Sequence, residues 1–140
     1  KDARLGGGEA RLQKLREKGI LTARERIDYI LDAGSFVELN MMAEHQCRDF
    51  GMEAKKFLGD GVITGHGTIN GRHVFIYSED ASVLGGSTGK THGAKIHYVL
   101  RLAREYMVPV ICLSNLTMNS FQAARLASMK WLAMTMTWCE

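Results

Sequence analysis

The spacing of hydrophobic residues near the start of the chain is helical. Within residues 9–18, Leu12 and Leu15 lie three positions apart, which places both side chains on one face of a helix. Gly19 follows directly, and glycine suits the left-handed turn that commonly ends a helix. A first helix is therefore predicted to end at Gly19.

A second helix is predicted to begin after Thr22. Thr22 and Glu25 have the spacing of a capping box, in which the threonine hydroxyl accepts a hydrogen bond from an amide of the first turn and the glutamate accepts one from the threonine amide. We expect Gly34 to end this helix. Its predicted inward face consists of Ile27, Ile30 and Leu31.

The pattern changes to β-rich runs in the middle of the chain. Residues 36–39 predict a short strand, and residues 62–69 and 72–77 predict two more. The last two runs are separated by Asn70-Gly71, the pair that best tolerates the positive φ angles of a two-residue hairpin turn. A β-hairpin is therefore predicted here, and the polar stretch before it is expected to be irregular.

A further helix and strand are predicted after the hairpin. Residues 91–106 have helical periodicity, and residues 108–113 form a short apolar run typical of a buried strand. Together with the hairpin they make a β-loop-α-β unit, in which small molecules usually bind near the strand ends. The predicted inward residues of the helix are Ile96, Val99, Leu100 and Ala103.

The loop of this unit, SVLGGSTGKTHGAK from Ser82 to Lys95, has the ending of a phosphate-binding P-loop. A P-loop needs a glycine five residues before Gly89, where this chain has Leu84, and the nearest alternative, Gly85, gives a spacing one residue short. The following strand also ends without the aspartate that holds magnesium in such proteins. Nucleotide binding is therefore disfavoured, although a glycine-rich loop before a helix still favours an anionic ligand.

Composition indicates one domain or half of one. The chain has 140 residues, of which 46% are hydrophobic and 24% charged, and its net charge of +3 suits a phosphate-bearing ligand better than nucleic acid. Neither a signal peptide nor an apolar run of membrane-spanning length is recognised, so an intracellular, reduced protein is expected. His45 and Cys47 lack a second pair at a zinc-ligand spacing, and we expect no metal. The three cysteines are Cys47, Cys112 and Cys139.

The composition changes near the C-terminal end. All 15 glycines lie between Gly6 and Gly93, and the stretch from Ser114 has neither glycine nor proline but both tryptophans. We therefore divide the chain into a helical lead-in (1–34), a ββα core (35–113) and a divergent tail (114–140).

Four stretches resemble one family in consistent order over roughly residues 6–113: LTARERIDYILDAGSFVEL, EHQCRDFGME, GDGVITGHGTINGRHVFIYSEDASVLGGSTGKTHGAKI and VPVICL. They resemble the start of the carboxyltransferase (β) subunit of biotin-dependent acyl-CoA carboxylases of the propionyl-CoA carboxylase β type. Related acyl-CoA decarboxylases are similar too. The resemblance implies an α/β fold, the N-terminal part of a crotonase-like (ClpP/crotonase) carboxyltransferase domain built from ββα units in a spiral.

The reaction implied by the resemblance moves a carboxyl group between N1 of biotin and the α-carbon of a short-chain acyl-CoA such as propionyl-CoA. Carboxybiotin on a carrier protein would be the cofactor, acyl-CoA the substrate, and no metal is implied in this chain. The implied partners are a biotin carboxyl carrier or biotin carboxylase subunit, and further carboxyltransferase chains in a homo-oligomer. The expected location is the cytoplasm, or the mitochondrial matrix in a eukaryote.

The resemblance also implies where the ligand lies. The pantetheine and thioester of the family's ligand pass the region matching Ser82 to Gly89, because glycines let a ligand approach the main chain. Lys90 and Lys95 are candidate partners of CoA phosphates, and the alternative is that both are solvated residues of the first helical turns. His92 is either a proton shuttle or a hydrogen-bonded helix residue. The candidate ligand-binding residues are Gly85, Gly86, Ser87, Gly89, Lys90 and Lys95.

The resemblance breaks after the Pro109 strand. The family continues with an aspartate-serine-glycine-glycine-alanine-arginine turn whose glycine amides form an oxyanion hole, whereas residues 115–120 here read NLTMNS. Side chains at the glycine positions obstruct a thioester and disfavour a strained turn. The expectation is an enzyme fragment that is inactive unless completed, with a tail that is truncated, frameshifted or diverged. The alternatives are a non-catalytic CoA-binding or assembly module, a decarboxylase subunit, and a P-loop-like nucleotide binder.

Overall fold

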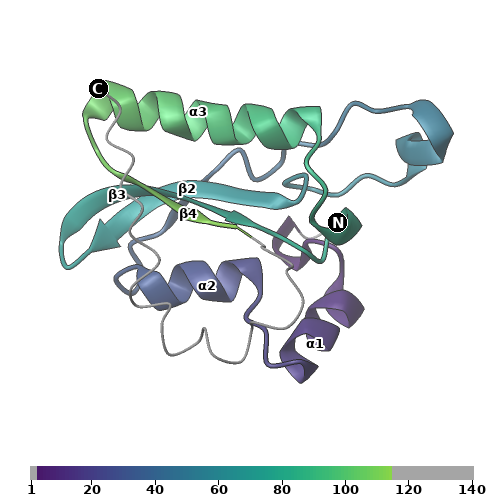
Figure 1. The fold of residues 1–140 in the computed structure, drawn as a ribbon, viewed down its shortest axis with the longest axis horizontal. Helices are drawn as coiled ribbons and strands as arrows, with labels where there is room; N and C mark the ends of the chain where they lie inside the picture. The colour runs from purple at the N-terminus through teal and green to yellow at the C-terminus, as the bar shows by residue number, and fades with distance from the viewer. Residues whose placement is uncertain (1–2, 115–140) are drawn as a thin grey trace.

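A computed structural model describes residues 3–114, which form one mixed four-stranded sheet covered by helices on both faces (Figure 1). The strand order is β1-β2-β3-β4. Helix α3 lies over one face and α2 over the other, with α1 beyond α2. The helices are α1 (Glu9–Glu17), α2 (Ala23–Ile30) and α3 (Lys90–Tyr106), the strands are β1 (Val37–Leu39), β2 (Val62–Ile69), β3 (Arg72–Glu79) and β4 (Val110–Leu113), and short 3-10 turns occupy Ala3–Leu5, Asp49–Ala54 and Leu84–Gly86.

The predicted hairpin is confirmed. Strands β2 and β3 pair antiparallel from Val62 opposite Glu79 to Ile69 opposite Arg72. Asn70 and Gly71 have φ angles of 50° and 75°, as the two-residue turn requires.

Asp32 holds this hairpin turn from outside the sheet. Its carboxylate accepts hydrogen bonds from the Thr68 hydroxyl (2.6 Å) and from the backbone amides of Asn70 and Gly71 (2.9 Å each). The Thr68 hydroxyl, followed by the two amides, lowers the pKa of Asp32 below its ordinary value. The hairpin turn is thus tied to the segment that follows α2.

The predicted helix ends were right for α1 and wrong for α2. Gly19 has a φ of 69° just after α1, as expected. The capping box at the start of α2 is present, because the Thr22 hydroxyl accepts from the Glu25 amide (3.3 Å) and Glu25 accepts from the Thr22 amide (2.8 Å). The helix ends at Ile30, since Leu31 is already extended, so Gly34 belongs to a later turn and does not end it.

Each face of the sheet carries its own hydrophobic core. On the α2 side, Ile27 and Ile76 are fully buried, and the predicted inward residues Ile30 and Leu31 belong to the same cluster. On the α3 side, Phe75, Val99 and Ala103 are buried together. The sheet is therefore packed on both sides, as expected for an α/β domain.

The predicted inward face of α3 needs correction. Val99 and Ala103 are buried, but Leu100 is 43% exposed and Ile96 is only partly buried. The face that meets the sheet continues instead through His92 and Lys95. Hydrophobicity alone missed this face because two of its four residues are polar.

Strands β2 and β3 with α3 form the predicted ββα unit, and β4 follows it. Strand β4 pairs parallel with β3, with Ile76 opposite Ile111. The predicted division into residues 1–34, 35–113 and 114–140 stays a prediction, and nearly all of the third part lies outside the described residues. Within residues 3–114, no helix has both the length and the apolarity needed to cross a membrane.

Candidate ligand cleft at the N-terminus of α3

An open cleft of about 450 Å³ lies beside the first turn of α3. One wall is formed by Leu84 and residues 87–91, and the other by residues 45–47 and Met52, with Asp60 between them. The second wall belongs to the connection between β1 and β2, which extends away from the sheet as an arm (Figure 1). The cleft therefore opens where the β-loop-α-β pattern placed a ligand.

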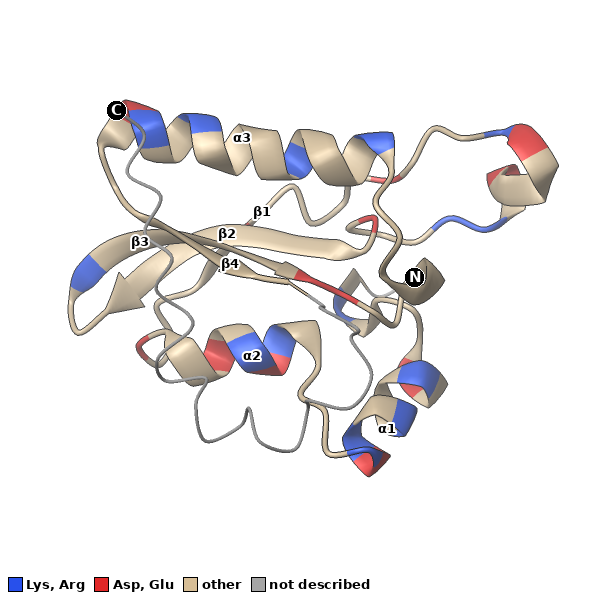
Figure 2. Ribbon diagram, in the orientation of Figure 1, with Lys and Arg blue, Asp and Glu red and all other residues tan. Residues whose placement is uncertain are grey.

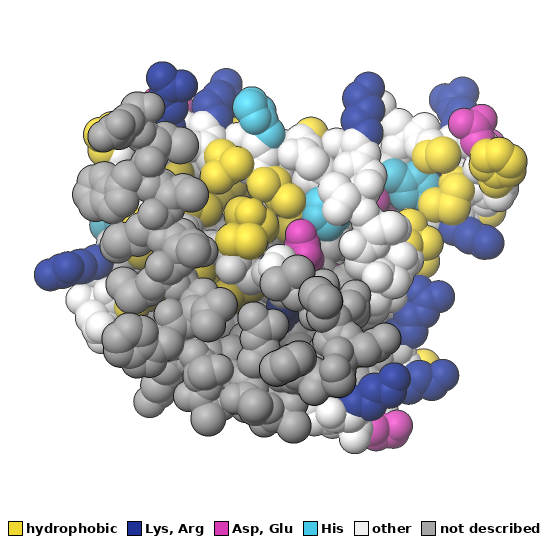
Figure 3. Space-filling view, in the orientation of Figure 1, with side chains coloured by type: hydrophobic (Ala, Val, Ile, Leu, Met, Phe, Trp, Pro, Cys, Tyr) yellow, Lys and Arg dark blue, Asp and Glu magenta, His cyan; other side chains and the backbone are white. Residues whose placement is uncertain are grey.

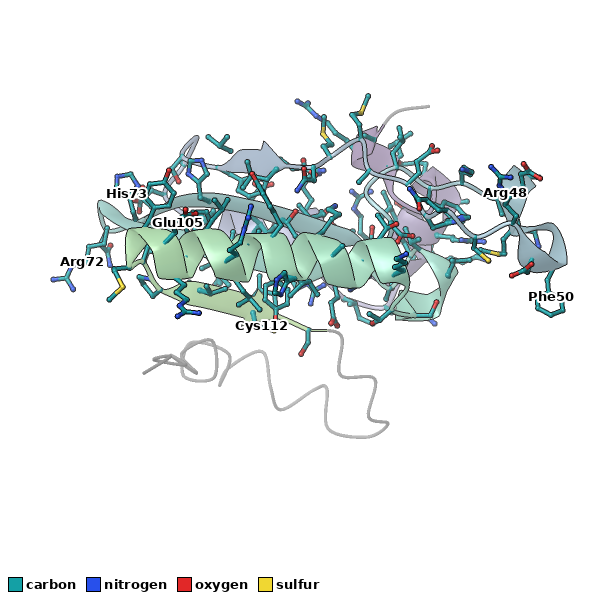
Figure 4. The ribbon with its side chains drawn as sticks, turned by 90° about the horizontal axis from the view of Figure 1, so that it is seen from above. Arg48, Phe50, Arg72, His73, Glu105 and Cys112 are labelled. Carbon is teal, nitrogen blue, oxygen red and sulfur yellow. The ribbon has the colours of Figure 1, made fainter. Side chains whose placement is uncertain are left out.

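The arm carries an exposed aromatic residue at its far end. Phe50 is fully exposed and has a φ of 53°, a left-handed conformation that a large side chain rarely adopts. Figure 4 shows Phe50 pointing away from the body of the domain, with Arg48 near it. The arm is closed at its base by a hydrogen bond between His45 Nε2 and the Lys55 carbonyl (2.9 Å).

The glycine loop turns by a run of left-handed residues. Leu84, Gly85 and Gly86 have φ angles of 46°, 67° and 83°. The Ser87 hydroxyl donates to the Leu84 carbonyl (3.0 Å), which closes the turn. A Cβ added at Gly85 would meet nothing within 4 Å, so this part of the backbone faces open space.

Ser82 anchors the base of the loop to the N-terminal segment. Its hydroxyl accepts a hydrogen bond from the Gly7 amide (3.0 Å), and its carbonyl accepts one from Arg11 Nη1 (3.0 Å). Its own amide donates to Asp80 Oδ1 (2.9 Å). A Cβ on Gly7 would overlap the Ser82 carbonyl, so only glycine allows this approach.

Helix α3 meets a carboxylate at its N-terminus. Gly89 is the N-cap residue and provides no side-chain cap. Instead, Asp60 Oδ2 accepts a hydrogen bond from the His92 amide (2.9 Å). Asp60 is 6% exposed, so this bond is largely shielded from water. A negative group near a helix N-terminus is stabilised by the helix dipole. The turn that resembles a P-loop thus already has an anion beside it.

His92 lies beneath the loop and does not face it. It is fully buried, and its Nδ1 is 3.1 Å from the Asp60 carbonyl oxygen. Its Nε2 has no hydrogen-bond partner among the described residues. Of the two interpretations of His92, the geometry shows the hydrogen-bonded one.

Lys95 is buried, which contradicts the interpretation that it is solvated. It is 3% exposed, and its Nζ donates to the carbonyls of Gly59 (2.8 Å) and Val62. Because these bonds direct the ammonium group to the turn before β2, Lys95 is also wrongly placed for a CoA phosphate. Burial lowers the pKa of Lys95 to about 8, and the nearby carboxylates of Glu38 and Asp60 oppose that shift.

The other candidate residues lie at the cleft. Ser87, Gly89 and Lys90 line it, and Lys90 is exposed. Gly85 and Gly86 belong to the adjoining turn. Whether these residues bind a ligand stays a prediction.

Sequence reasoning missed Asp60 and His45 as cleft residues. Asp60 lies between Gly59 and Gly61, and all three have positive φ angles (82°, 46° and 74°). The glycine-aspartate-glycine pattern was therefore a usable signal for a special turn. Among residues 3–114, no group of three or more histidine, cysteine, aspartate or glutamate side chains is placed to hold a metal ion.

A ββα unit whose glycine loop opens onto a cleft at a helix N-terminus defines an α/β domain with a candidate ligand site. Residues 14–117 match the sequence profile described as the carboxyl transferase domain. The chain therefore belongs to the carboxyl transferase domain family. This confirms both the predicted family and the crotonase-like α/β fold class.

Individual relatives agree with this assignment. The propionyl-CoA carboxylase beta chain of Roseobacter denitrificans is 50% identical over 113 residues, covering 81% of this chain and 22% of that protein. The methylmalonyl-CoA decarboxylase subunit alpha of Veillonella parvula is 46% identical over 110 residues, covering 79% and 22%. The crystal structure of a transcarboxylase 12S hexamer with methylmalonyl-coenzyme A and methylmalonic acid bound matches with a TM-score of 0.77 and 39% identity, covering 79% and 21%. The chain thus spans about a fifth of the length of the curated relatives it matches.

Proposed function

We propose that this chain provides the acyl-CoA side of a biotin-dependent carboxyltransferase. The reaction moves a carboxyl group between carboxybiotin and the α-carbon of a short-chain acyl-CoA such as propionyl-CoA. The observation that carries the proposal is the glycine turn Leu84–Gly86, which adjoins the cleft in a chain that is 50% identical to a propionyl-CoA carboxylase beta chain over 113 residues.

The cleft suits the elongated arm of a CoA thioester. Its glycine turn leaves backbone groups accessible, and its walls offer hydroxyls from Ser87, Thr88 and Thr91. Carboxyl transfer at the α-carbon proceeds through an enolate, so a domain of this kind must hold the thioester near backbone donors that stabilise the developing negative charge. In this family those donors follow the strand that corresponds to β4, and residues 115–120 lie outside the described part of the chain.

Biotin supplies the carboxyl group in this proposal, carried on a partner protein. The described residues on the cleft fit an acyl-CoA arm, and we place none of them against the biotin ring. The proposed partners are a biotin carboxyl carrier or biotin carboxylase subunit and further carboxyltransferase chains in a homo-oligomer. The proposed location is the cytoplasm, or the mitochondrial matrix in a eukaryotic cell.

Two alternatives share the same cleft. A non-catalytic CoA-binding or assembly module would keep the scaffold without the oxyanion turn, which the sequence NLTMNS at residues 115–120 favours. A decarboxylase subunit is favoured by the 46% identity to the Veillonella parvula protein. Both alternatives predict CoA binding at the glycine loop. The non-catalytic module would transfer no carboxyl group, and the decarboxylase subunit would remove one from its acyl-CoA.

Calorimetric titration with propionyl-CoA and, separately, with magnesium-ATP tests the proposal. Gly85→Ala is the informative variant, and Gly19→Ala is its matched control. Both glycines have similar left-handed φ angles (67° and 69°), and at both a Cβ would meet nothing within 4 Å. The two substitutions therefore introduce the same backbone strain, one beside the cleft and one after α1.

The expected result is saturable propionyl-CoA binding that Gly85→Ala weakens at least tenfold and Gly19→Ala leaves unchanged. ATP binding without CoA binding in the wild type would overturn the proposal and favour a nucleotide site. Equal binding by both variants would show that the ligand lies elsewhere on the chain.

A further inference from the structure

The glycine loop before α3 resembles a P-loop in sequence, but the group that meets the N-terminus of its helix is different. In a P-loop, backbone amides and a lysine converge on a phosphate. Here the carboxylate of Asp60 accepts a hydrogen bond from the His92 amide in the first turn of α3. We propose that Asp60 is a specificity-determining residue, which excludes phosphate groups from this cleft and reserves it for an uncharged, hydrogen-bonding stretch of the ligand.

This inference rests on the proposed function for the identity of the ligand. It adds that Asp60 keeps phosphate groups out of the cleft, beside the pantetheine arm that the family resemblance already implies there. The phosphates of CoA must then lie away from the first turn of α3, so this inference replaces the predicted role of Lys90 as a phosphate partner. The amide-bearing arm lies in the cleft.

Two residues of α3, His92 and Lys95, hold Asp60 and its neighbours in position. Its Oδ2 accepts from the His92 amide (2.9 Å), and its carbonyl oxygen lies 3.1 Å from His92 Nδ1. Lys95 donates to the carbonyls of Gly59 and Val62, on either side of it. Because α3 holds the whole turn, the carboxylate has little freedom to move aside for a phosphate.

The charges around the cleft support exclusion of an anion. Among the described residues, the cleft is lined by one carboxylate, that of Asp60, and one ammonium group, that of Lys90. Lys90 is exposed, and Lys95 directs its ammonium group to backbone carbonyls. An entering phosphate would therefore meet the Asp60 carboxylate in a partly buried place, where repulsion between like charges is weakly screened.

The opposite wall offers an independent sign that a polar ligand binds here. His45 lines the cleft and is 7% exposed. Its Nε2 bonds the Lys55 carbonyl, but its Nδ1 has no partner among residues 3–114. A buried polar atom without a partner is costly, and a ligand amide would satisfy it. Ser87 and Thr88 line the same cleft.

Asp60→Asn tests the inference directly, because its side-chain oxygen can still accept from the His92 amide while the negative charge is removed. Asp80→Asn is the matched control. Asp80 is also 6% exposed and also accepts from a backbone amide, that of Ser82 (2.9 Å), but it does not line this cleft. Asp60→Ser is a second variant, since serine also caps helices well.

The probes are inorganic pyrophosphate and pantetheine. Calorimetry measures the binding of each, and shifts in the amide NMR signals of residues 87–91 show whether it binds at the cleft. The wild type and Asp80→Asn are expected to bind pantetheine and to show no saturable pyrophosphate binding. Asp60→Asn or Asp60→Ser, whichever melts like the wild type, is expected to bind pyrophosphate at least tenfold more tightly than the wild type.

Three results would overturn the inference. The first is pyrophosphate binding by the wild type as tight as that by Asp60→Asn, and the second is no gain in pyrophosphate affinity in either folded variant. The third is a wild type that binds propionyl-CoA but not pantetheine. The proposed function is judged separately. A wild type that binds no propionyl-CoA contradicts that function, whereas the pyrophosphate comparison still reports on Asp60.

Discussion

Lys95 carries an ammonium group into the interior of the domain. Its partners are two backbone carbonyls, and no carboxylate oxygen lies within hydrogen-bonding distance of it among the described residues. Burial without a full counter-charge disfavours the protonated form, which is why its pKa falls from 10.5 to about 8. The same side chain fixes the turn that presents Asp60 to α3.

Lys95→Met gives a prediction about pH. Between about pH 8 and pH 10.5 the unfolded chain keeps the lysine proton while the folded chain has lost it, so the contribution of Lys95 to stability rises with pH. The free energy of unfolding of the wild type minus that of Lys95→Met is expected to rise by roughly 2 kcal/mol between pH 7.5 and pH 10. Urea unfolding at both pH values measures it, and a constant difference would contradict the prediction.

At the scale of elements, the hairpin β2–β3 depends on a residue outside it. Asp32 follows α2, yet its carboxylate accepts three hydrogen bonds from the end of β2 and from the turn. The turn residues Asn70 and Gly71 were readable from the sequence because their φ requirement is local. The contribution of Asp32 was not readable, because it depends on where α2 is packed.

Asp32→Asn is expected to lower the melting temperature near neutral pH. The folded pKa of Asp32 is below its unfolded value of about 3.8, so the stabilisation is complete above that value and is lost as pH falls through the folded pKa. The gap between the wild type and Asp32→Asn should therefore close in strong acid. Thermal melts from pH 7 to pH 2 measure the gap, with Asp28→Asn on the exposed face of α2 as the control. A gap that stays constant into acid would contradict the role given to the carboxylate.

The helices show where sequence patterns were sufficient and where they were not. The capping box at Thr22 and the turn at Gly19 involve only neighbouring residues, so spacing alone predicted them. The inward face of α3 involves His92 and Lys95, whose polar atoms reach carbonyls more than 30 residues away. Their burial could not follow from a hydrophobic pattern. The place of Asp60 beside α3 also depends on a contact 32 residues away, although its two flanking glycines marked a special turn.

At the scale of the whole molecule, the N-terminal segment and the glycine loop are joined through Ser82. Gly7 and Arg11 both bond Ser82, and the Arg11 guanidinium also lies over the Phe57 ring at 5.8 Å. Figure 2 shows both basic and acidic residues along α1, and Leu12 is the residue of this helix that is buried. Figure 3 shows apolar side chains grouped beneath α3 on the viewed face.

Gly7→Ala tests the link between the N-terminal segment and the loop. A Cβ at Gly7 would overlap the Ser82 carbonyl, whereas one at Gly93 would meet nothing within 4 Å, and neither glycine has a positive φ. Gly7→Ala is expected to reduce the free energy of unfolding by about 1–3 kcal/mol, as overpacking does. Gly93→Ala is expected to be neutral or slightly stabilising, since it lies in α3. Denaturant unfolding compares the two, and equal effects would show that Ser82 is not held by this contact.

The bonds between the N-terminal segment and Ser82 also bear on how the chain folds. They join residues 75 and 71 positions apart. During synthesis Gly7 and Arg11 emerge before Ser82, so they cannot make these bonds until the hairpin that precedes Ser82 is complete. Closing so long a stretch of chain is entropically slow, and contacts of this kind form late in folding. The glycine loop that follows Ser82 would therefore take its final shape late in folding, when Gly7 and Arg11 dock against Ser82.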